Sequence, residues 1–196
     1  MAYRLRDIVL AILGLLGFSW LILLLIPILA LSQERTFFIQ ERTGWRGVPF
    51  KLIKFSTLRD IRAGEREEDN QQGRLTAVGK FLRRFSLDEI PQLINVLKGD
   101  MSLVGPRPFI HEYWPIYSEA QKQRFEVKPG ITGWAQINGR NAITFNERFK
   151  LDAWYIENRS FGLDLKIIFK TAGKAFGGSD VYANTATTSE KFNGTN

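Results

Sequence analysis

IVLAILGLLGFSWLILLLIPILAL, residues 8–31, is an apolar run without a charged residue near the start of the chain. Formed as one α-helix, it would be about 36 Å long at ~1.5 Å per residue, longer than a hydrocarbon core of about 30 Å. The run exceeds the apolar region of a signal peptide, which is about 7–15 residues long. The stretch therefore predicts a retained anchor, and we assign residues 1–35 to a membrane-anchoring helix.

Positive charges flank the apolar run on both sides. Arg4 and Arg6 precede it, and Arg35, Arg42 and Arg46 follow it. Cytoplasmic flanks are enriched in such residues, so both ends are predicted to face the cytoplasm. A re-entrant helix that enters and leaves by one face satisfies both ends, and Gly14, Gly17 and Pro27 are suitable places for its break. A simple span with Pro27 near its end fits the sequence equally well.

Composition narrows the class of protein. The 196 residues have room for one compact domain beside the membrane segment. The absence of cysteine excludes disulfides and thiol nucleophiles, and the single histidine, His111, excludes metal sites built on two histidines. Lys and Arg number 27 against 20 Asp and Glu, a net charge of +7. Beside a membrane anchor this excess suggests anionic lipid or phosphorylated substrates, and without a basic stripe or known binding module we expect no nucleic acid partner.

The pattern after residue 35 predicts a mixed fold. Thr36–Ile39 and Phe50–Phe55 are short apolar runs on either side of a glycine-containing connection, which is typical of a β-hairpin. Helical spacing of apolar residues follows over Thr76–Leu97, Glu112–Phe125, Thr144–Ile156 and Leu163–Phe176. The predicted class is α+β, mostly helical with a small β-hairpin, a membrane-inserted re-entrant helix at the N-terminus and amphipathic helices at the interface. Residues 36–184 form the predicted main domain, and residues 185–196 a polar tail.

The segment Ser86–Pro91 carries two adjacent carboxylates. Ser86 and Glu89 have the spacing of a capping box, which would put Asp88 in the first helical turn, where the helix dipole favours a negative charge. These features are typical of an ordinary helix start. They also suit a nucleophile, because an ionised Asp88 can attack phosphorus to give an acyl phosphate while Glu89 helps to bind a divalent cation or transfers protons. The local pattern leaves both readings open.

Several cations lie in settings that suit phosphate binding. Arg107 follows Gly105 in a loop stiffened by two prolines, and Arg140 lies next to Gly139, where the backbone can approach a ligand closely. Guanidinium groups bind phosphate oxygens in a fork, so such arginines suit a diphosphate. Lys54 and Arg83 add further charge. Each of these residues alone is most often a solvated surface cation.

Longer motifs resemble a known family. They are Phe38–Gly44, Phe50–Phe55, Ser86–Gln92, Asn95–Pro108 and Lys128–Asn141. In their order and spacing they resemble the bacterial sugar transferase family, the monotopic phosphoglycosyl transferases, over roughly residues 3–196. The tail Thr188–Gly194 also resembles that of the short members that start protein-glycan assembly from a diacetamido sugar.

The resemblance implies a reaction and its participants. Asp88 would attack the β-phosphorus of a UDP-sugar, release UMP and retain the phosphosugar, and undecaprenyl phosphate would then take the phosphosugar from the enzyme. Asp88 and Glu89 would hold the cofactor Mg²⁺. The residues implied at the substrate and its phosphates are Lys54, Arg83, Arg107, Arg140 and Asp152. Residues 36–184 would be the catalytic domain, at the cytoplasmic face of the bacterial inner membrane, in contact with lipid. An N-acetylated or diacetamido sugar is the expected donor sugar.

The membrane helix departs from the family at one position. Family members usually carry Ser-Pro in the middle of this helix, whereas this chain has Ser19-Trp20.

Two other functions remain as alternatives to the phosphoglycosyl transferase. The first is a glycosyltransferase that releases UDP instead of UMP. The second is a non-catalytic membrane scaffold for a glycan pathway.

Overall fold

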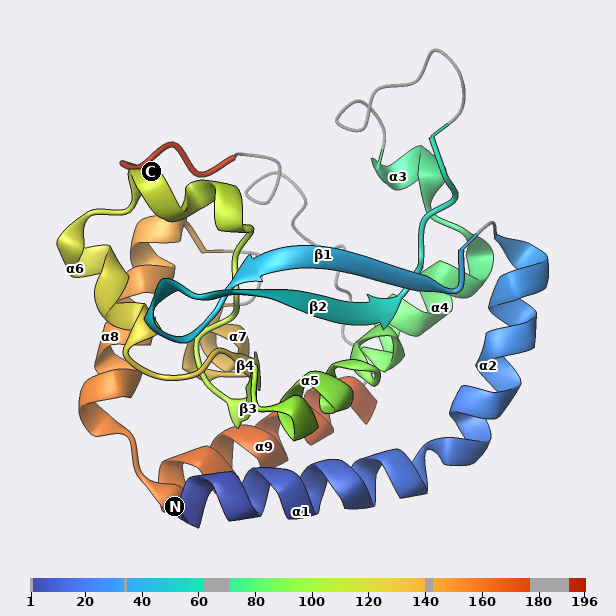
Figure 1. The fold of residues 1–196 in the computed structure, drawn as a ribbon, viewed down its shortest axis with the longest axis horizontal. Helices are drawn as coiled ribbons and strands as arrows, with labels where there is room; N and C mark the ends of the chain where they lie inside the picture. The colour runs from blue at the N-terminus through green and yellow to red at the C-terminus, as the bar shows by residue number, and fades with distance from the viewer. Residues whose placement is uncertain (1, 34, 62–70, 140–142, 177–190) are drawn as a thin grey trace.

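The computed structural model describes residues 2–33, 35–61, 71–139, 143–176 and 191–196 (Figure 1). Its longer helices are α1 (Ala2–Gly17), α2 (Ser19–Ser32), α4 (Ala77–Arg84), α5 (Gln92–Lys98), α8 (Phe145–Asn158) and α9 (Phe161–Phe176). Its short helical segments are η1 (Trp45–Gly47), α3 (Gln71–Arg74), η2 (Leu87–Glu89), η3 (His111–Ile116), α6 (Glu119–Lys122), η4 (Gln123–Phe125) and α7 (Trp134–Asn138). Its strands are β1 (Phe37–Thr43), β2 (Pro49–Phe55), β3 (Ser102–Val104) and β4 (Gly130–Thr132). The predicted mostly helical α+β class is confirmed.

The predicted hairpin is confirmed and is longer than the two apolar runs. β1 and β2 pair antiparallel in a register that runs from Phe37 opposite Phe55 to Thr43 opposite Pro49. Gly47 has φ +80° in the turn, and a Cβ at that position would lie 2.4 Å from the Trp114 ring, so only glycine fits there. The hairpin crosses the middle of the molecule in Figure 1 and points its open end toward α4.

The apolar run folds as two helices, not one. α1 and α2 meet at Phe18 with a bend of 61°, and among the described residues no single helix is long and apolar enough to cross a bilayer, although this bent pair is. The Ser19 hydroxyl donates to the Leu16 carbonyl oxygen (2.7 Å) beside the bend. The break therefore lies next to Gly17 and Ser19-Trp20. Pro27 lies inside α2, which continues through it to Ser32.

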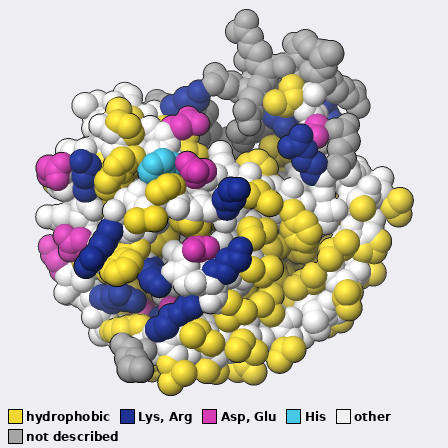
Figure 2. All heavy atoms as spheres, in the orientation of Figure 1, with side chains coloured by type: hydrophobic (Ala, Val, Ile, Leu, Met, Phe, Trp, Pro, Cys, Tyr) yellow, Lys and Arg dark blue, Asp and Glu magenta, His cyan; other side chains and the backbone are white. Residues whose placement is uncertain are grey.

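α1 and α2 frame the molecule from below and from one side (Figure 1). Gly14 lets α1 pack closely on α5, since a Cβ there would lie 3.0 Å from the Leu93 side chain. The outward side chains of the two helices stay uncovered, and Figure 2 shows a continuous apolar surface along this edge. Its large members include Leu5, Val9, Leu13, Leu16, Trp20, Leu23, Leu24 and Leu31.

The predicted helix over Thr76–Leu97 is wrong in its middle. Thr76 caps α4 by accepting the Gly79 amide (2.9 Å), but the helix ends at Arg84. Ser86 then adopts a left-handed conformation (φ 56°, ψ 24°) and its side chain makes no cap, so the predicted capping box is also wrong. A single 3-10 turn, η2, and Pro91 separate this bend from α5. The bend turns Asp88 away from the helical path and into the body of the protein.

The later helices were predicted unevenly. α8 and α9 match the predicted ranges, and Thr144 caps α8 in a capping box with Glu147. The single helix predicted over Glu112–Phe125 is instead η3, α6 and η4. Tyr117 is extended and Ser118 begins a new capping box there. The short parallel pair of β3 and β4 was not predicted, since three-residue strands carry no detectable alternation.

Aromatic residues close the core at one end of the molecule. Phe109, Tyr117, Phe125 and Phe149 form a buried cluster that also includes Phe192 from the end of the chain. The described part of the tail, 191–196, has no helix or strand. It is held in place by Phe192, which is only 3% exposed and packs in this aromatic cluster.

Candidate active site

Five of the residues singled out in the sequence lie together. Lys54 comes from the end of β2, Arg83 from the last turn of α4, Asp88 and Glu89 from η2, and Arg107 from the loop after β3. Arg107 Nη2 lies 2.6 Å from Glu89 Oε1, and Asp88 interacts electrostatically with all four other residues. The fold therefore surrounds two carboxylates with three cations from separate elements.

Asp88 is buried at 6% exposure, and burial is the largest influence on its carboxyl. Burial, with Glu89 next to it, raises the pKa of Asp88 to about 6, against the opposing effect of Lys54, Arg83 and Arg107. The expectation that a helix dipole governs this group is wrong, because Asp88 lies in a single 3-10 turn. The carboxyl remains mostly ionised at neutral pH, which a nucleophile requires.

Lys54 is the cation most affected by its surroundings. Burial, aided by Arg83 and Arg107, lowers the pKa of the Lys54 ammonium to about 8, while Asp88 and Glu89 oppose the shift. Its Nζ lies 5.0 Å from the centre of the Phe38 ring across the hairpin. Lys54 is therefore a desolvated cation, whose attraction for a bound phosphate is stronger than that of a solvated one.

The two arginines are held in different ways. Arg83 Nε donates to the hydroxyl of Thr57 (2.8 Å), a residue that is 3% exposed at the end of the hairpin. The Arg107 side chain remains 42% exposed and Glu89, its ion-pair partner, raises the pKa of the guanidinium. One arginine is thus fixed by a neutral acceptor and the other by a charged one, and both leave further N–H groups for a ligand.

Arg42 belongs with this group, although sequence reasoning counted it only among the charges that flank the membrane segment. Burial and the charge of Arg107 lower the pKa of Arg42 to about 10, and Glu89 opposes the shift. Arg42 Nη2 donates to Gln40 Oε1 (2.5 Å), and its Nε is buried without a hydrogen-bond partner in the described structure. The signal that could have identified Arg42 is its place in the motif Phe38–Gly44.

The two remaining predicted site residues are Arg140 and Asp152. Arg140 lies outside the described residues. Asp152 lies in α8 at 1% exposure, and its Oδ2 is 2.8 Å from Nη2 of Arg124. The groups that perturb the Asp88 carboxyl do not include Asp152. Arg148 of α8 connects the two regions, because burial together with the charges of Arg107 and Arg124 lowers the pKa of Arg148 to about 10.

The donor set fits a magnesium ion that is shared with a ligand. Among the described residues no three acidic or histidine side chains gather as a metal site. Mg²⁺ is commonly held by one or two carboxylates with substrate phosphates and water completing its shell, and Asp88 and Glu89 supply that number of carboxylates. Glu89 Oε1 also accepts a hydrogen bond from Arg107 Nη2 (2.6 Å), which fixes the carboxylate beside Asp88.

Comparisons with known proteins agree with the motifs. A sequence model of the bacterial sugar transferase family matches residues 1–178. The chain is 48% identical over 192 residues to "Uncharacterized sugar transferase EpsL" of Bacillus subtilis, and the match covers 97% of this chain and 95% of the relative. It is 41% identical over 184 residues to the Escherichia coli "UDP-glucose:undecaprenyl-phosphate glucose-1-phosphate transferase", covering 88% of this chain and 40% of that longer protein. It is 40% identical over 149 residues to the Salmonella typhimurium "Undecaprenyl-phosphate galactose phosphotransferase", and this match covers 67% of this chain and 31% of that longer protein.

Proposed function

The chain belongs to the bacterial sugar transferase family, and from this membership we propose that it is a polyprenol-phosphate phosphoglycosyl transferase. It transfers a sugar 1-phosphate from a UDP-sugar to undecaprenyl phosphate. The name of the Escherichia coli relative states this reaction for UDP-glucose, and the name of the Salmonella relative mentions undecaprenyl phosphate and galactose. The observation that carries the proposal is the buried Asp88 carboxylate with Glu89 beside it and Lys54, Arg83 and Arg107 around it.

The first step is attack on the donor. An Asp88 oxygen forms a bond to the β-phosphorus of the UDP-sugar, and the bond from that phosphorus to the bridging oxygen breaks. The electron pair stays on the bridging oxygen, so the leaving group is UMP and the enzyme retains an acyl phosphosugar. The raised pKa of Asp88, about 6, still leaves an ionised nucleophile at neutral pH and makes it more basic than an exposed aspartate.

The second step regenerates the enzyme. A phosphate oxygen of undecaprenyl phosphate attacks the same phosphorus, and the bond to Asp88 breaks with its electrons returning to the carboxylate. The product is undecaprenyl diphosphate sugar. Phosphoryl transfer depends mainly on positioning and charge neutralisation, which Lys54, Arg83 and Arg107 supply to the phosphates. Asp88 and Glu89 would hold Mg²⁺, which would neutralise phosphate charge.

We place the reaction at the cytoplasmic face of the bacterial inner membrane. The uncovered apolar side chains of α1 and α2 support insertion into lipid. The 61° bend at Phe18 supports a re-entrant helix, and it lies beside Ser19-Trp20, the pair that replaces the usual Ser-Pro of the family.

The donor sugar is the finer part of the proposal. The tail resemblance favours an N-acetylated or diacetamido sugar, whereas the names of the relatives mention glucose and galactose. The test must therefore offer donors of both kinds.

Nucleotide release tests the function. Purified protein in detergent receives Mg²⁺, undecaprenyl phosphate and one of a panel of UDP-sugars, beside an Asp88→Asn variant and a sample with EDTA. Lipid-dependent UMP that is lost in both controls supports the transferase and identifies its donor. UDP as the product would mean direct glycosyl transfer, and no nucleotide from any donor would favour the scaffold.

A further inference from the structure

A buried ion pair lies behind the candidate active site. Arg124 of η4 and Asp152 of α8 place Nη2 and Oδ2 2.8 Å apart, and each side chain is 2% exposed. A ligand at Asp88 has no access to a carboxylate at this depth. The function of Asp152 must therefore act through the residues that it touches.

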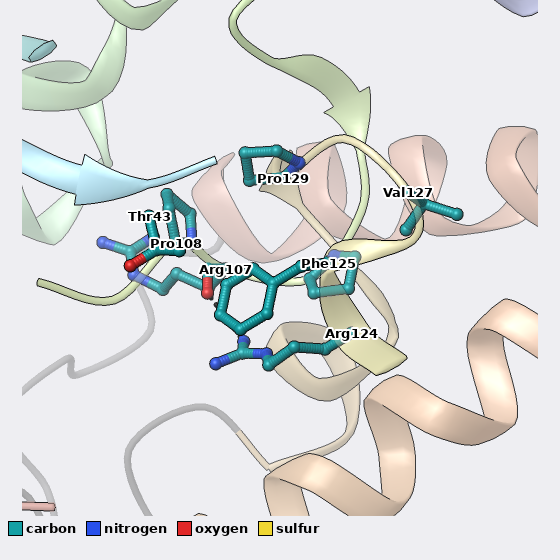
Figure 3. Close-up of a pocket in the computed structure, with 8 residues that line it drawn as sticks. Thr43, Arg107, Pro108, Arg124, Phe125, Val127 and Pro129 are labelled. Carbon is teal, nitrogen blue, oxygen red and sulfur yellow. Dashed lines mark hydrogen bonds between the residues drawn. The ribbon is translucent and has the colours of Figure 1, made fainter. Parts of the chain in front are cut away.

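Arg124 connects this pair to the active site. The Nη2 that faces Asp152 also donates to the main-chain oxygen of Arg107 (2.7 Å). The side chain of Arg107 in turn donates to Glu89 Oε1 (2.6 Å), next to Asp88. Figure 3 shows Arg107 and Arg124 beside Phe125 in the same small pocket. A continuous series of contacts thus runs from α8 to the two carboxylates.

Aromatic rings hold the Arg124 guanidinium in place. Its Cζ lies 4.1 Å from the centre of the Phe109 ring and 5.3 Å from that of Phe149. Its Nε and Nη1 are buried without hydrogen-bond partners in the described structure, so Nη2 carries its directed polar contacts. An apolar pair would fill this space at a lower desolvation cost. What the ionic pair adds is a fixed donor for the Arg107 carbonyl.

We propose that Asp152 is a positioning residue, which through Arg124 fixes the loop of Arg107 so that its guanidinium stays beside Glu89 and Asp88. This assignment replaces the expectation that Asp152 contacts the substrate. The expected effect of Asp152 on catalysis rests on the proposed function. The effect on the Arg107 loop does not depend on what the enzyme transfers.

The experiment compares Asp152→Asn with a matched variant. Asp164→Asn also removes a buried carboxylate, one that pairs with Arg6 (2.6 Å) and not with Arg124. Hydrogen exchange of the Gly105, Arg107 and Phe109 amides reports the loop in the intact protein in detergent. We expect Asp152→Asn to speed exchange of these amides and Asp164→Asn to leave them close to wild type. If Asp152→Asn fails to fold, Arg124→Met is the second variant: it removes Nη2 with both of its contacts and should speed exchange of the same amides.

Kinetics supply the second readout. We expect Asp152→Asn to lower kcat/KM by about 100-fold, the effect of misplacing a binding group by about 1 Å. The double variant Asp152→Asn with Arg107→Ala should have the same kcat/KM as Arg107→Ala alone, because both substitutions act on the same group, the Arg107 guanidinium. Additive losses, together with unchanged exchange of the loop amides, would overturn the proposal. A wild-type protein that releases no UMP would refute the proposed function instead, and the exchange comparison would still decide this inference.

Discussion

Arg107 Nη2 lies 2.6 Å from Glu89 Oε1, and this contact joins the loop after β3 to the 3-10 turn that carries Asp88. A turn of three residues has little stability of its own. Its position is set by this ion pair and by the left-handed Ser86 before it (φ 56°). Backbone strain of this kind persists where the surrounding structure enforces it, and it clusters at active sites. The carboxylates and cations are thus held by contacts between segments that lie far apart in the sequence.

The pH dependence of the reaction follows from the two perturbed groups. Asp88 must be ionised to attack, and since its pKa is raised to about 6, activity should rise as the pH increases through about 6. Lys54 loses its charge as the pH rises through its lowered pKa of about 8, so activity should fall beyond that point. A bell-shaped profile of kcat/KM for UMP release checks this. A flat profile between pH 5 and 9 would contradict the assignment of both groups.

Arg42 should contribute to binding the donor phosphates. Arg42→Gln removes a desolvated cation close to Arg107, so affinity for UMP should fall by about tenfold, the scale of one charge-assisted hydrogen bond. Affinity for uridine, which has no phosphate, should change little. Isothermal titration of both ligands measures the difference. Arg46→Gln, at the exposed tip of the hairpin, is the matched control, and an equal loss of uridine and UMP affinity in Arg42→Gln would argue against phosphate binding.

Thr57 should affect catalysis through Arg83. Thr57→Val keeps the shape of the side chain but removes the acceptor of the Arg83 Nε proton, so kcat/KM should fall by roughly tenfold. Thr57→Ser restores a hydroxyl and should recover most of the activity. Steady-state UMP release measures both variants, with thermal unfolding as the check on folding. Equal activities of the valine and serine variants would show that the Arg83 contact is unimportant.

The membrane arrangement can be tested with single cysteines, since the chain has none of its own. Ala2→Cys and Ser32→Cys place exposed reporters at the two ends of the bent pair α1–α2. For a re-entrant helix, an impermeant maleimide should label neither site in intact spheroplasts and both sites in inverted vesicles. Labelling of only one site from outside would establish a simple span.

The sequence predicted the elements whose signals are local. The hairpin follows from two short apolar runs around a glycine-containing connection, and α8 and α9 follow from helical spacing of apolar residues. A break in the N-terminal helix was one of two alternatives that the sequence left open. The bend at Phe18 adjoins Gly17, one of the three candidate places for it, whereas Gly14 and Pro27 lie inside helices. The failures lie where tertiary contacts override propensity: Ser86 has the residues of a capping box and yet adopts a left-handed turn that buries Asp88.

The candidate site was predicted in its residues but not in its environment. Asp88, Glu89, Lys54, Arg83 and Arg107 were all named from motifs, yet only the fold brings them together. The raised pKa of Asp88 depends on burial, which no local pattern reveals. Arg42 was overlooked because an arginine in a short strand gives the same signal whether it is solvated or buried. The Arg124 contact with Asp152 joins residues of two separate helical segments, so sequence spacing offered no indication of it.

The most direct test of the central claim is to trap the phosphosugar on the enzyme. The protein is incubated with its UDP-sugar and Mg²⁺ but without undecaprenyl phosphate, then digested with trypsin. The fragment Phe85–Lys98 contains Asp88 and Glu89 as its only carboxylate side chains, so fragment-ion mass spectrometry can assign an adduct to one of them. The account predicts the added mass of one sugar phosphate on Asp88, absent from Asp88→Asn. An unmodified fragment, from a protein that still releases UMP when the acceptor lipid is present, would contradict the covalent mechanism.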